Sequence, residues 1–266
     1  MKRTVEYPGR TAVVTGGASG IGKGLAASLK KRGMDVVIAD IDQTALDATA
    51  LELGVVAIRT DVTDAQSVQA LADRVLEQFG AVHVVCNNAG VGPMAPISEL
   101  TLGDWKWMID VNLFGVIHGV NSFLPLLKRN HDWGHIINTS SMSVLAPPKN
   151  LGAYVAAKAA VFGMTEVLAQ ELAAEGSVVG ATALVPGPIR SNIQNSLRNR
   201  PANEEGALFD VDISENGKSF RFLEPHDVGE LVIDAIDRGL TMAPTHPEWL
   251  GQVTERHQDI QAAFSI

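Results

Sequence analysis

The sequence is poor in cysteine and has fewer basic than acidic side chains. Its one cysteine, Cys86, excludes an intramolecular disulfide framework and is typical of a reducing compartment. The neighbours of Cys86, VHVVCNN, form an apolar run, which favours a buried core residue over a nucleophile. The formal net charge is −9 and the isoelectric point about 5.2, which argues against a basic face for nucleic acid.

Other absences narrow the class of protein further. No apolar run approaches the roughly 18 residues of a membrane-spanning helix. The start, MKRTVEYPGR, has no apolar segment, so we expect no secretory signal. No group of histidine, cysteine and carboxylate residues has the spacing of metal ligands, so no metal site is predicted. We therefore expect a cytoplasmic protein without a nucleic-acid or membrane partner.

What is present is an alternation of short apolar runs with segments of helical periodicity. Six runs have the length of a strand: 11–15, 35–40, 55–60, 82–86, 135–140 and 180–185. Continuous apolar runs are typical of parallel strands that are buried on both faces. Residues 64–79 repeat apolar side chains at helical spacing, and Thr63 with Gln66 predicts a capping box before them. The alternation predicts a single doubly wound parallel sheet flanked by helices, in one α/β domain over 1–266.

One segment, 192–222, interrupts this rhythm because it is polar and broken by proline and glycine. A loop of this length inside a compact domain is usually a binding loop or partly disordered. It follows the sixth predicted strand, and ligands of open α/β sheets bind at the carboxyl ends of the strands. We therefore predict a substrate lid over 192–222, inserted before a C-terminal extension at 241–266.

A glycine-rich turn follows the first predicted strand. Gly16, Gly20 and Gly22 have the spacing G-x-x-x-G-x-G at the start of a helical segment. Without side chains, the backbone amides of such a turn can approach a pyrophosphate at the positive end of the helix. Any tight strand-to-helix connection favours glycine, so the turn alone is weak support. The second predicted strand ends in Asp40, at the distance expected for the carboxylate of a dinucleotide site.

Asp40 also indicates which dinucleotide is bound. Its carboxylate can accept hydrogen bonds from both ribose hydroxyls of NAD and would repel the additional phosphate of NADP. No basic residue follows it, since Ile41 and Asp42 are next, and Ser19 stands where a basic residue could bind that phosphate. The residues favour NAD, although Asp40 could also serve as a strand-end turn residue or a helix cap.

The segment YVAAK places Tyr154 and Lys158 four residues apart in an alanine-rich helical stretch. Side chains at this spacing lie on the same face of a helix. They could belong to a surface helix whose tyrosine packs and whose lysine faces water. They could also be a proton-transfer pair, because a nearby cation stabilises phenolate and a free tyrosine has a pKa of about 10.

Seven motifs together decide between these interpretations. In order, they are TGGASGIG (15–22), DVT (61–63), NNAG (87–90), VNLFG (111–115), NTSS (138–141), YVAAK (154–158) and PGPIRS (186–191). Over roughly residues 8–240 the sequence resembles the short-chain dehydrogenase/reductase family, in which such motifs occur with this order and spacing. The resemblance implies a Rossmann-type domain that binds NAD and assembles as a homodimer or homotetramer.

The family's functional positions can be carried over residue by residue. The resemblance implies a catalytic set of Asn112, Ser141, Tyr154 and Lys158. In that set Ser141 binds the substrate oxygen, and Asn112 bends its helix and holds a water that leads to Lys158. The resemblance also implies cofactor contacts at Gly16, Ser19, Gly20, Ile21, Gly22, Asp40, Asp61, Val62, Asn88, Ala89, Gly90, Tyr154, Lys158, Pro186, Gly187, Ile189 and Ser191.

Some positions depart from the family pattern. The frequent glycine two residues beyond Ser141 is missing, and so is the frequent closing DGG near the C-terminus. The predicted pocket walls are apolar and consist of Met94, Ile97, Met142, Leu145, Pro147, Leu151, Leu197, Phe209 and Phe222. A weaker resemblance, to the lignin-type benzylic (Cα) alcohol dehydrogenases, rests on PGPIRSNI and EPHDVGELVIDAI. His246 and Trp249 in the C-terminal part are interpreted as packing residues.

The sequence therefore predicts an NAD-dependent oxidoreductase that interconverts a secondary alcohol and a ketone, with a hydrophobic or aromatic substrate. The alternative is a catalytically silent NAD-binding sensor or scaffold. The complete set of four catalytic positions argues against that alternative, because a silent protein could lose them without harm.

Overall fold

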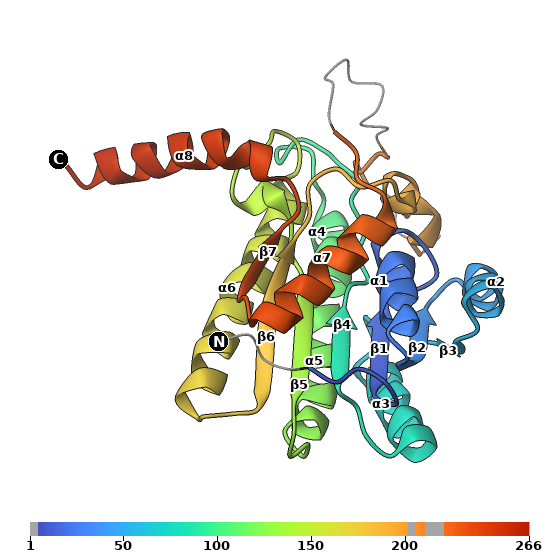
Figure 1. Cartoon of the computed structure of the whole chain (residues 1–266). Helices are drawn as coiled ribbons and strands as arrows, with labels where there is room; N and C mark the ends of the chain where they lie inside the picture. The colour runs from blue at the N-terminus through green and yellow to red at the C-terminus, as the bar shows by residue number, and fades with distance from the viewer. Residues whose placement is uncertain (1–4, 202–205, 211–220, 266) are drawn as a thin grey trace.

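The computed structural model describes residues 5–201, 206–210 and 221–265, and within them a seven-stranded parallel sheet lies between two layers of helices (Figure 1). The strands are β1 (Thr11–Thr15), β2 (Asp35–Asp40), β3 (Val56–Arg59), β4 (Val84–Asn87), β5 (Gly134–Thr139), β6 (Val179–Val185) and β7 (Met242–Pro244). Their order is β3-β2-β1-β4-β5-β6-β7, so the chain reverses its winding direction between β1 and β4. The predicted doubly wound parallel sheet is confirmed.

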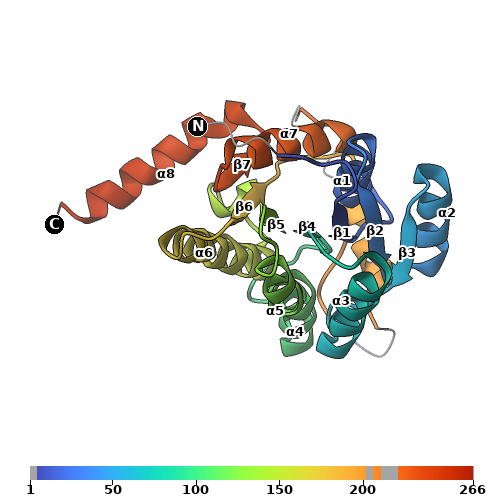
Figure 2. The same cartoon turned by 60° about the horizontal axis from the view of Figure 1, so that its bottom comes forward.

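Helices cover both faces of this sheet, as Figure 2 shows. The two layers and the connections contain α1 (Gly20–Lys31), α2 (Gln43–Leu53), α3 (Ala65–Phe79), α4 (Leu102–Ile109), α5 (Gly115–Leu127), α6 (Gly152–Ala174), α7 (Pro225–Arg238) and α8 (Leu250–Ala263). Successive strand residues point to opposite faces. Val14 accordingly packs with α1 and α7, whereas its neighbour Val13 packs with α3, α5 and α6. Burial on both faces explains why the strands are apolar throughout.

Local details differ from the sequence-based expectations. The helix predicted over 64–79 begins one residue later, because Asp64 is its N-cap and accepts a hydrogen bond from the backbone of Gln66. The predicted capping box at Thr63 is therefore wrong, and the Thr63 hydroxyl donates to Asp61 instead. The short strand β7, which pairs with β6, was not predicted.

Two helical stretches, Leu102–Leu127 and Gly152–Ala174, are long and apolar enough to cross a membrane by length and composition alone. Neither stretch is an uninterrupted apolar run, because polar and charged residues are interspersed in both, so the expectation of no such run is not contradicted. The first stretch runs through α4 and α5, and the second is α6. Residues of α5 and α6 belong to the core that covers the sheet, and core helices pass the same test.

The helices α1 and α7 approach each other so closely that only glycine fits at their contact. A Cβ atom on Gly24 of α1 would lie 2.0 Å from the carbonyl oxygen of Pro225 at the start of α7. One on Gly229 would lie 2.4 Å from Oγ of Ser28. The guanidinium of Arg32 pairs with the Glu230 carboxylate through two hydrogen bonds, of 3.1 and 2.8 Å, and so closes the contact on its exposed side.

We expect Gly24→Ala to lower the free energy of unfolding by about 2–4 kcal/mol, because the added methyl group would meet backbone atoms that cannot rotate away. Urea denaturation measures the change. The matched control is Gly251→Ala at the start of α8, where an added Cβ meets nothing within 4 Å. The control should keep or slightly raise stability, since alanine is the better helix former. Equal stability of the two variants would contradict the close approach of α1 and α7.

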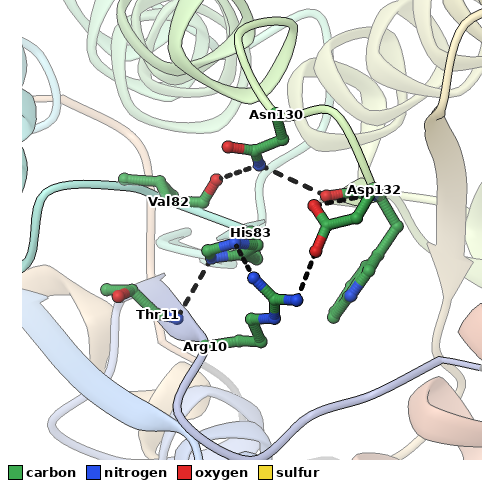
Figure 3. Close-up of polar contacts among 7 residues, drawn as sticks. Arg10, Thr11, Val82, His83, Asn130 and Asp132 are labelled. Atoms are coloured by element: carbon green, nitrogen blue, oxygen red, sulfur yellow. Dashed lines mark hydrogen bonds and ion pairs between the residues drawn. The ribbon is translucent and has the colours of Figure 1, made fainter.

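A polar cluster lies at the amino-terminal ends of the central strands (Figure 3). Ligands in such folds bind at the opposite, carboxyl ends of the strands. The backbone N–H of Thr11 donates to Nδ1 of His83 at 3.3 Å, and Arg10 lies 3.3 Å from Nε2 of the same ring. Arg10 also forms an ion pair with Asp132, and Asn130 donates to the carbonyl oxygen of Val82. Burial, followed by the charge of Arg10, lowers the pKa of His83. The cluster thus holds the starts of β1, β4 and β5 together around a neutral imidazole.

Candidate active site

A cavity of about 840 Å³ lies at the carboxyl ends of the strands. Its wall contains the glycine turn after β1, Asp40 at the end of β2 and the loops that follow β4, β5 and β6. All the predicted cofactor positions lie on this wall except Gly22. Of the predicted catalytic residues, the wall contains Ser141, Tyr154 and Lys158, whereas Asn112 lies behind it.

The glycine turn forms a backbone cradle with no room for side chains. Gly16 and Gly20 have φ angles of +65° and +49°, in the left-handed region that favours glycine. A Cβ on Gly22 would lie 2.1 Å from the carbonyl oxygen of Gly16, so Gly22 supports the turn from behind. Ser19 precedes α1 without making a side-chain cap. An anionic group can therefore approach the backbone donors at this helix start.

Asp40 is held against the glycine turn. Its carboxylate accepts hydrogen bonds from the backbone N–H groups of Ala18, at 3.2 Å, and Asp42, at 3.1 Å. Burial raises the pKa of Asp40, and these backbone hydrogen bonds oppose that effect. Among the described residues of the wall, only Lys158 and Arg198 are basic. The Asp40 end of the cavity is thus suited to hydroxyl groups and not to an additional phosphate.

Asp61 and Val62 form the neighbouring part of the wall. The Asp61 carboxylate accepts hydrogen bonds from the backbone N–H and the hydroxyl of Thr63, at 2.9 and 2.7 Å. The carbonyl oxygen of Val62 is bound by Nδ1 of His118 at 2.9 Å. These contacts fix the turn after β3 and leave the Val62 side chain against Gly115, where a Cβ would lie 2.9 Å from it.

The loop after β4 is fixed by polar contacts to both neighbouring strands. Nδ2 of Asn88 donates to the carbonyl oxygen of Thr15 at 3.1 Å, and the Thr139 hydroxyl donates to Oδ1 of Asn88 at 3.3 Å. A Cβ on Gly90 would lie 2.9 Å from Oδ1 of Asn112 and 3.3 Å from Nζ of Lys158. Glycine at position 90 therefore lets these two side chains come close to the loop.

Asn112 occupies a π-helical turn, Asp110–Phe114 (η1), between α4 and α5. Its Nδ2 donates to the carbonyl oxygens of Val91 and Met108, both at 3.0 Å, and its Oδ1 accepts from the backbone N–H of Val91. Both amide hydrogens are therefore used in bracing the loop after β4. The helix is locally distorted into a π-helical turn at Asn112, while the predicted bend and the water relay from Asn112 to Lys158 stay predictions.

Tyr154 and Lys158 extend from the first turns of α6 into the cavity. Nζ of Lys158 lies 5.8 Å from the centre of the Tyr154 ring and donates to the carbonyl oxygen of Thr139 at 2.9 Å. The backbone carbonyl of Lys158 accepts a hydrogen bond from the Ser140 hydroxyl at 2.8 Å, which ties α6 to the end of β5. Ser140 thus has a structural contact, and the adjacent Ser141 is the serine on the cavity wall.

Burial shifts the ionisation of both residues toward their neutral forms. The pKa of Lys158 falls to about 8 because its ammonium is removed from water. Burial raises the pKa of Tyr154, and a hydrogen bond with Ser141 opposes that rise. With a pKa of about 8, Lys158 still carries its proton at pH 7, so a positive charge lies near the phenol and favours its ionised form during acid–base catalysis.

The outer part of the cavity is mostly apolar. Of the predicted pocket walls, Met94, Met142, Leu151 and Phe222 line it. The remaining predicted positions are exposed or pack elsewhere: Ile97, Leu145, Pro147, Leu197 and Phe209. Sequence reasoning missed Trp107 and assigned Trp249 to packing alone, and both line the cavity. No local motif marks either residue, because each reaches the cavity through the arrangement of distant elements.

Several described residues of the predicted lid line the cavity, among them Asn192, Ser196 and Phe222, and their role as a lid stays a prediction. The first segment of the predicted lid, Asn192–Asn199 (η3), consists of 3-10 helical turns interrupted by a kink at Asn195, and Oγ of Ser196 accepts a hydrogen bond from the backbone N–H of Gly92 at 3.1 Å. Nη1 of Arg200 pairs with the buried carboxylate of Asp104 at 2.6 Å. The lid prediction also covers 202–205 and 211–220, which lie outside the described residues.

No group of three or more histidine, cysteine or carboxylate side chains that could hold a metal ion occurs within the described ranges.

Comparisons with known proteins agree on one family. The profile of the short chain dehydrogenase family matches residues 10–202. The "Probable oxidoreductase EphD" of Mycobacterium tuberculosis is 34% identical over 250 residues, which are 91% of this chain and 42% of that protein. This chain therefore spans less than half the length of that relative. The C alpha-dehydrogenase of Sphingobium sp. is 33% identical over 258 residues, which cover 91% of this chain and 82% of that protein.

A solved structure matches the whole fold. A short chain dehydrogenase/reductase from Burkholderia phymatum, determined in complex with NAD, has a TM-score of 0.90 at 36% sequence identity. The match covers 98% of this chain and 97% of that one.

Proposed function

Since the chain belongs to the short chain dehydrogenase family and is an oxidoreductase of that family, we propose that it uses NAD to interconvert a secondary alcohol and a ketone. One observation carries this proposal: Tyr154, Lys158 and Ser141 share a single cavity with a glycine cradle and with Asp40. A proton-transferring pair and a dinucleotide cradle are the two parts that alcohol oxidation requires.

The residues present fit NAD. The cradle at Gly16–Gly22 offers backbone donors for the pyrophosphate, and Asp40 offers acceptors for the ribose hydroxyls. Asp61 and Val62 would hold the adenine, and Asn88–Gly90 would line the middle of the cofactor. The nicotinamide would be held by Pro186, Gly187, Ile189 and Ser191 on the loop after β6. The relative from Burkholderia phymatum, which is 36% identical, was solved with NAD and supports the same choice here.

The bound cofactor supplies an acceptor for the hydride that leaves the alcohol carbon. Tyr154 removes the hydroxyl proton as the carbon loses its hydride, so the alcohol loses two electrons and two hydrogens and becomes a ketone. Ser141 donates a hydrogen bond to the reacting oxygen and stabilises the charge that develops there. Lys158 supplies positive charge near the phenol ring. Reduction of a ketone runs through the same residues in reverse, with Tyr154 as the acid.

The outer cavity supports a hydrophobic or aromatic substrate. Its apolar wall includes two indole rings, Trp107 and Trp249, which favour flat, bulky groups. The similarity to the C alpha-dehydrogenase of Sphingobium sp. supports an alcohol next to an aromatic ring.

A substrate screen tests the proposal directly. NAD reduction is followed with aryl carbinols, steroids, aliphatic secondary alcohols and polyols, and the Tyr154→Phe variant supplies the background. We expect turnover above background with aryl carbinols and little with polyols. A clear preference for polyols would contradict the apolar pocket. Tight NAD binding without turnover of any alcohol class would favour a silent sensor or scaffold instead.

We expect Asp40→Ala to lower the preference for NAD over NADP, measured as the ratio of kcat/KM values, by about 10–100-fold. The variant removes a carboxylate that would repel the additional phosphate at short range. Asp42→Ala is the matched control, because Asp42 carries the same charge nearby but caps α2 and does not line the cavity. A wild-type protein that prefers NADP would contradict the role given to Asp40.

We also propose a homo-oligomer in the cytoplasm. Phe114, at the end of η1 just before α5, is 43% exposed and Val167 on α6 is 53% exposed, which leaves apolar surface on helical segments that could pair between subunits. The single, buried Cys86 suits a reducing compartment. Light scattering during gel filtration gives the subunit number, and a monomer would contradict the first part of this proposal.

A further inference from the structure

Ser143 is a polar residue on the cavity wall to which the reaction described above gives no role. It lies in the short 3-10 turn Met142–Val144 (η2) that follows β5, and it is only 7% exposed. Two of its atoms contact the same hydroxyl. The backbone N–H of Ser143 donates to Oγ of Ser141 at 3.1 Å, and the Ser143 hydroxyl donates to that oxygen at 2.9 Å.

These two contacts determine whether the Ser141 hydroxyl donates or accepts a hydrogen bond with any further partner. A serine hydroxyl has one hydrogen to donate and two lone pairs that accept. Both accepting positions of Ser141 are filled by Ser143, so its one hydrogen is left for another partner. Tyr154 lines the same cavity, and its contact with Ser141 lowers the pKa of the phenol. Ser143 thus holds Ser141 so that its hydrogen can be donated toward the phenol oxygen.

A hydroxyl that accepts hydrogen bonds becomes a stronger donor, because each bond polarises the next. A glycine at position 143 would supply the backbone N–H alone. The serine adds a second donor and fixes the rotation of the Ser141 hydroxyl, which could otherwise turn its hydrogen away from Tyr154. The effect favours negative charge on whichever oxygen accepts from Ser141.

We propose that Ser143 is a positioning residue that holds the Ser141 hydroxyl as a donor, toward Tyr154 in the free site and toward the oxygen of the substrate when one is bound. This inference rests on the proposed function, in which Tyr154 must give up its proton. Ser143 itself touches neither the transferred hydride nor the reacting oxygen, and it acts through Ser141.

The ionisation of Tyr154 tests the inference without knowledge of the substrate. The sequence has two tyrosines, so in a Tyr7→Phe background the ultraviolet absorption of phenolate reports Tyr154 alone. Rapid pH jumps with stopped-flow detection record the titration before the fold is lost. We expect Ser143→Ala to raise the midpoint by about half to one pH unit, the shift that corresponds to one ordinary hydrogen bond. Ser143→Thr, which restores a hydroxyl, should return it toward the starting value.

A double substitution separates positioning from a general structural effect. If Ser143 acts through Ser141, adding Ser143→Ala to a Ser141→Ala variant should produce no further shift. Ser122→Ala is the matched control, since Ser122 is a buried serine of α5 that does not line the cavity, and it should leave the midpoint unchanged. An unchanged midpoint in Ser143→Ala, or an equal shift in the presence and absence of Ser141, would overturn the inference.

The pH dependence of turnover is a second test, and it is measured at a lower pH than the phenolate titration. With an alcohol substrate from the screen, Ser143→Ala should lower kcat by about 10-fold and move the rise of the rate to higher pH, with the KM for NAD unchanged. Loss of turnover in Tyr154→Phe together with a normal pH dependence in Ser143→Ala would reject this inference alone. Full turnover in Tyr154→Phe would reject the proposed function, and the phenolate titration would still test Ser143.

Discussion

Replacement of Tyr154 by phenylalanine should leave NAD binding intact and lower kcat by about 1,000-fold or more. Phenylalanine keeps the ring that packs on the cavity wall and removes only the hydroxyl, so the loss measures proton transfer. General acid–base groups contribute about 10²–10⁴-fold to enzymatic rates. In this site the substitution also removes the phenol oxygen whose pKa the neighbouring Ser141 lowers.

The second tyrosine provides a matched control for this prediction. Tyr7 is buried and donates from its hydroxyl to Asp237 at 2.8 Å, away from the cavity. Tyr7→Phe should cost some stability, since the Asp237 carboxylate loses a partner, and should keep kcat close to that of the wild type. Fluorescence titration with NAD checks cofactor binding in both variants, and steady-state kinetics give kcat. Full turnover in Tyr154→Phe would remove Tyr154 from the chemistry.

Replacement of Lys158 by methionine should change activity and stability in opposite directions. Methionine has a similar length without the charge, so the phenol ring loses its positive neighbour and we expect kcat to fall by about 100-fold. The folded protein, by contrast, no longer has to bury an ammonium group. The shift of the Lys158 pKa from 10.5 to about 8 corresponds to roughly 3 kcal/mol of stability at neutral pH.

Part of that gain is offset because Thr139 loses the donor to its carbonyl oxygen, so we expect a net stabilisation of about 2 kcal/mol at pH 7. The pH dependence follows from the sign of the shift. Below about pH 8 both the folded and the unfolded chain carry the proton, and the cost of burial is present in full. Between about pH 8 and 10.5 the folded chain has lost the proton that the unfolded chain keeps, and the cost disappears as the pH rises.

Urea denaturation at pH 7 and at pH 10 therefore distinguishes this account from a simple packing effect. Lys158→Met should be more stable than the wild type at pH 7 and by a smaller margin at pH 10. Lys31→Met, which removes an exposed lysine at the end of α1, should change neither stability nor activity appreciably. A Lys158→Met variant that is less stable than the wild type at pH 7 would mean that the buried ammonium supports the fold.

The sequence predicted the parts of the site that depend on local spacing. Tyr154 and Lys158 lie four residues apart, and the structure brings Nζ of Lys158 to 5.8 Å from the phenol ring on one face of α6. The glycine turn and Asp40 were predictable for a similar reason, because a strand, a tight turn and a helix constrain one another over a few residues. The predicted strands likewise agree with the structure to within two residues at each end.

The remaining parts depend on contacts between residues far apart in the chain. Asp104 pairs with Arg200 across 96 positions, and nothing near either residue indicates the other. Trp249 reaches the cavity because β7 adds a seventh strand to the sheet, and that strand has only three residues, too few for a recognisable pattern. The double contact of Ser143 with Ser141 depends on the conformation of a 3-10 turn, which residue types alone do not determine.

The polar cluster around His83, at the amino-terminal ends of the strands, makes the stability of the fold depend on pH in the acid range. His83 faces a backbone donor and a guanidinium, and a neutral imidazole can accept from only one of them. Burial, followed by the charge of Arg10, lowers the folded pKa of His83 below the ordinary value of 6.5, so the unfolded chain binds a proton more readily than the folded chain. As the pH falls below about 6.5, this difference lowers the free energy of unfolding through a group that lies opposite the cavity. This loss of stability in acid is separate from the titration of the groups that line the cavity.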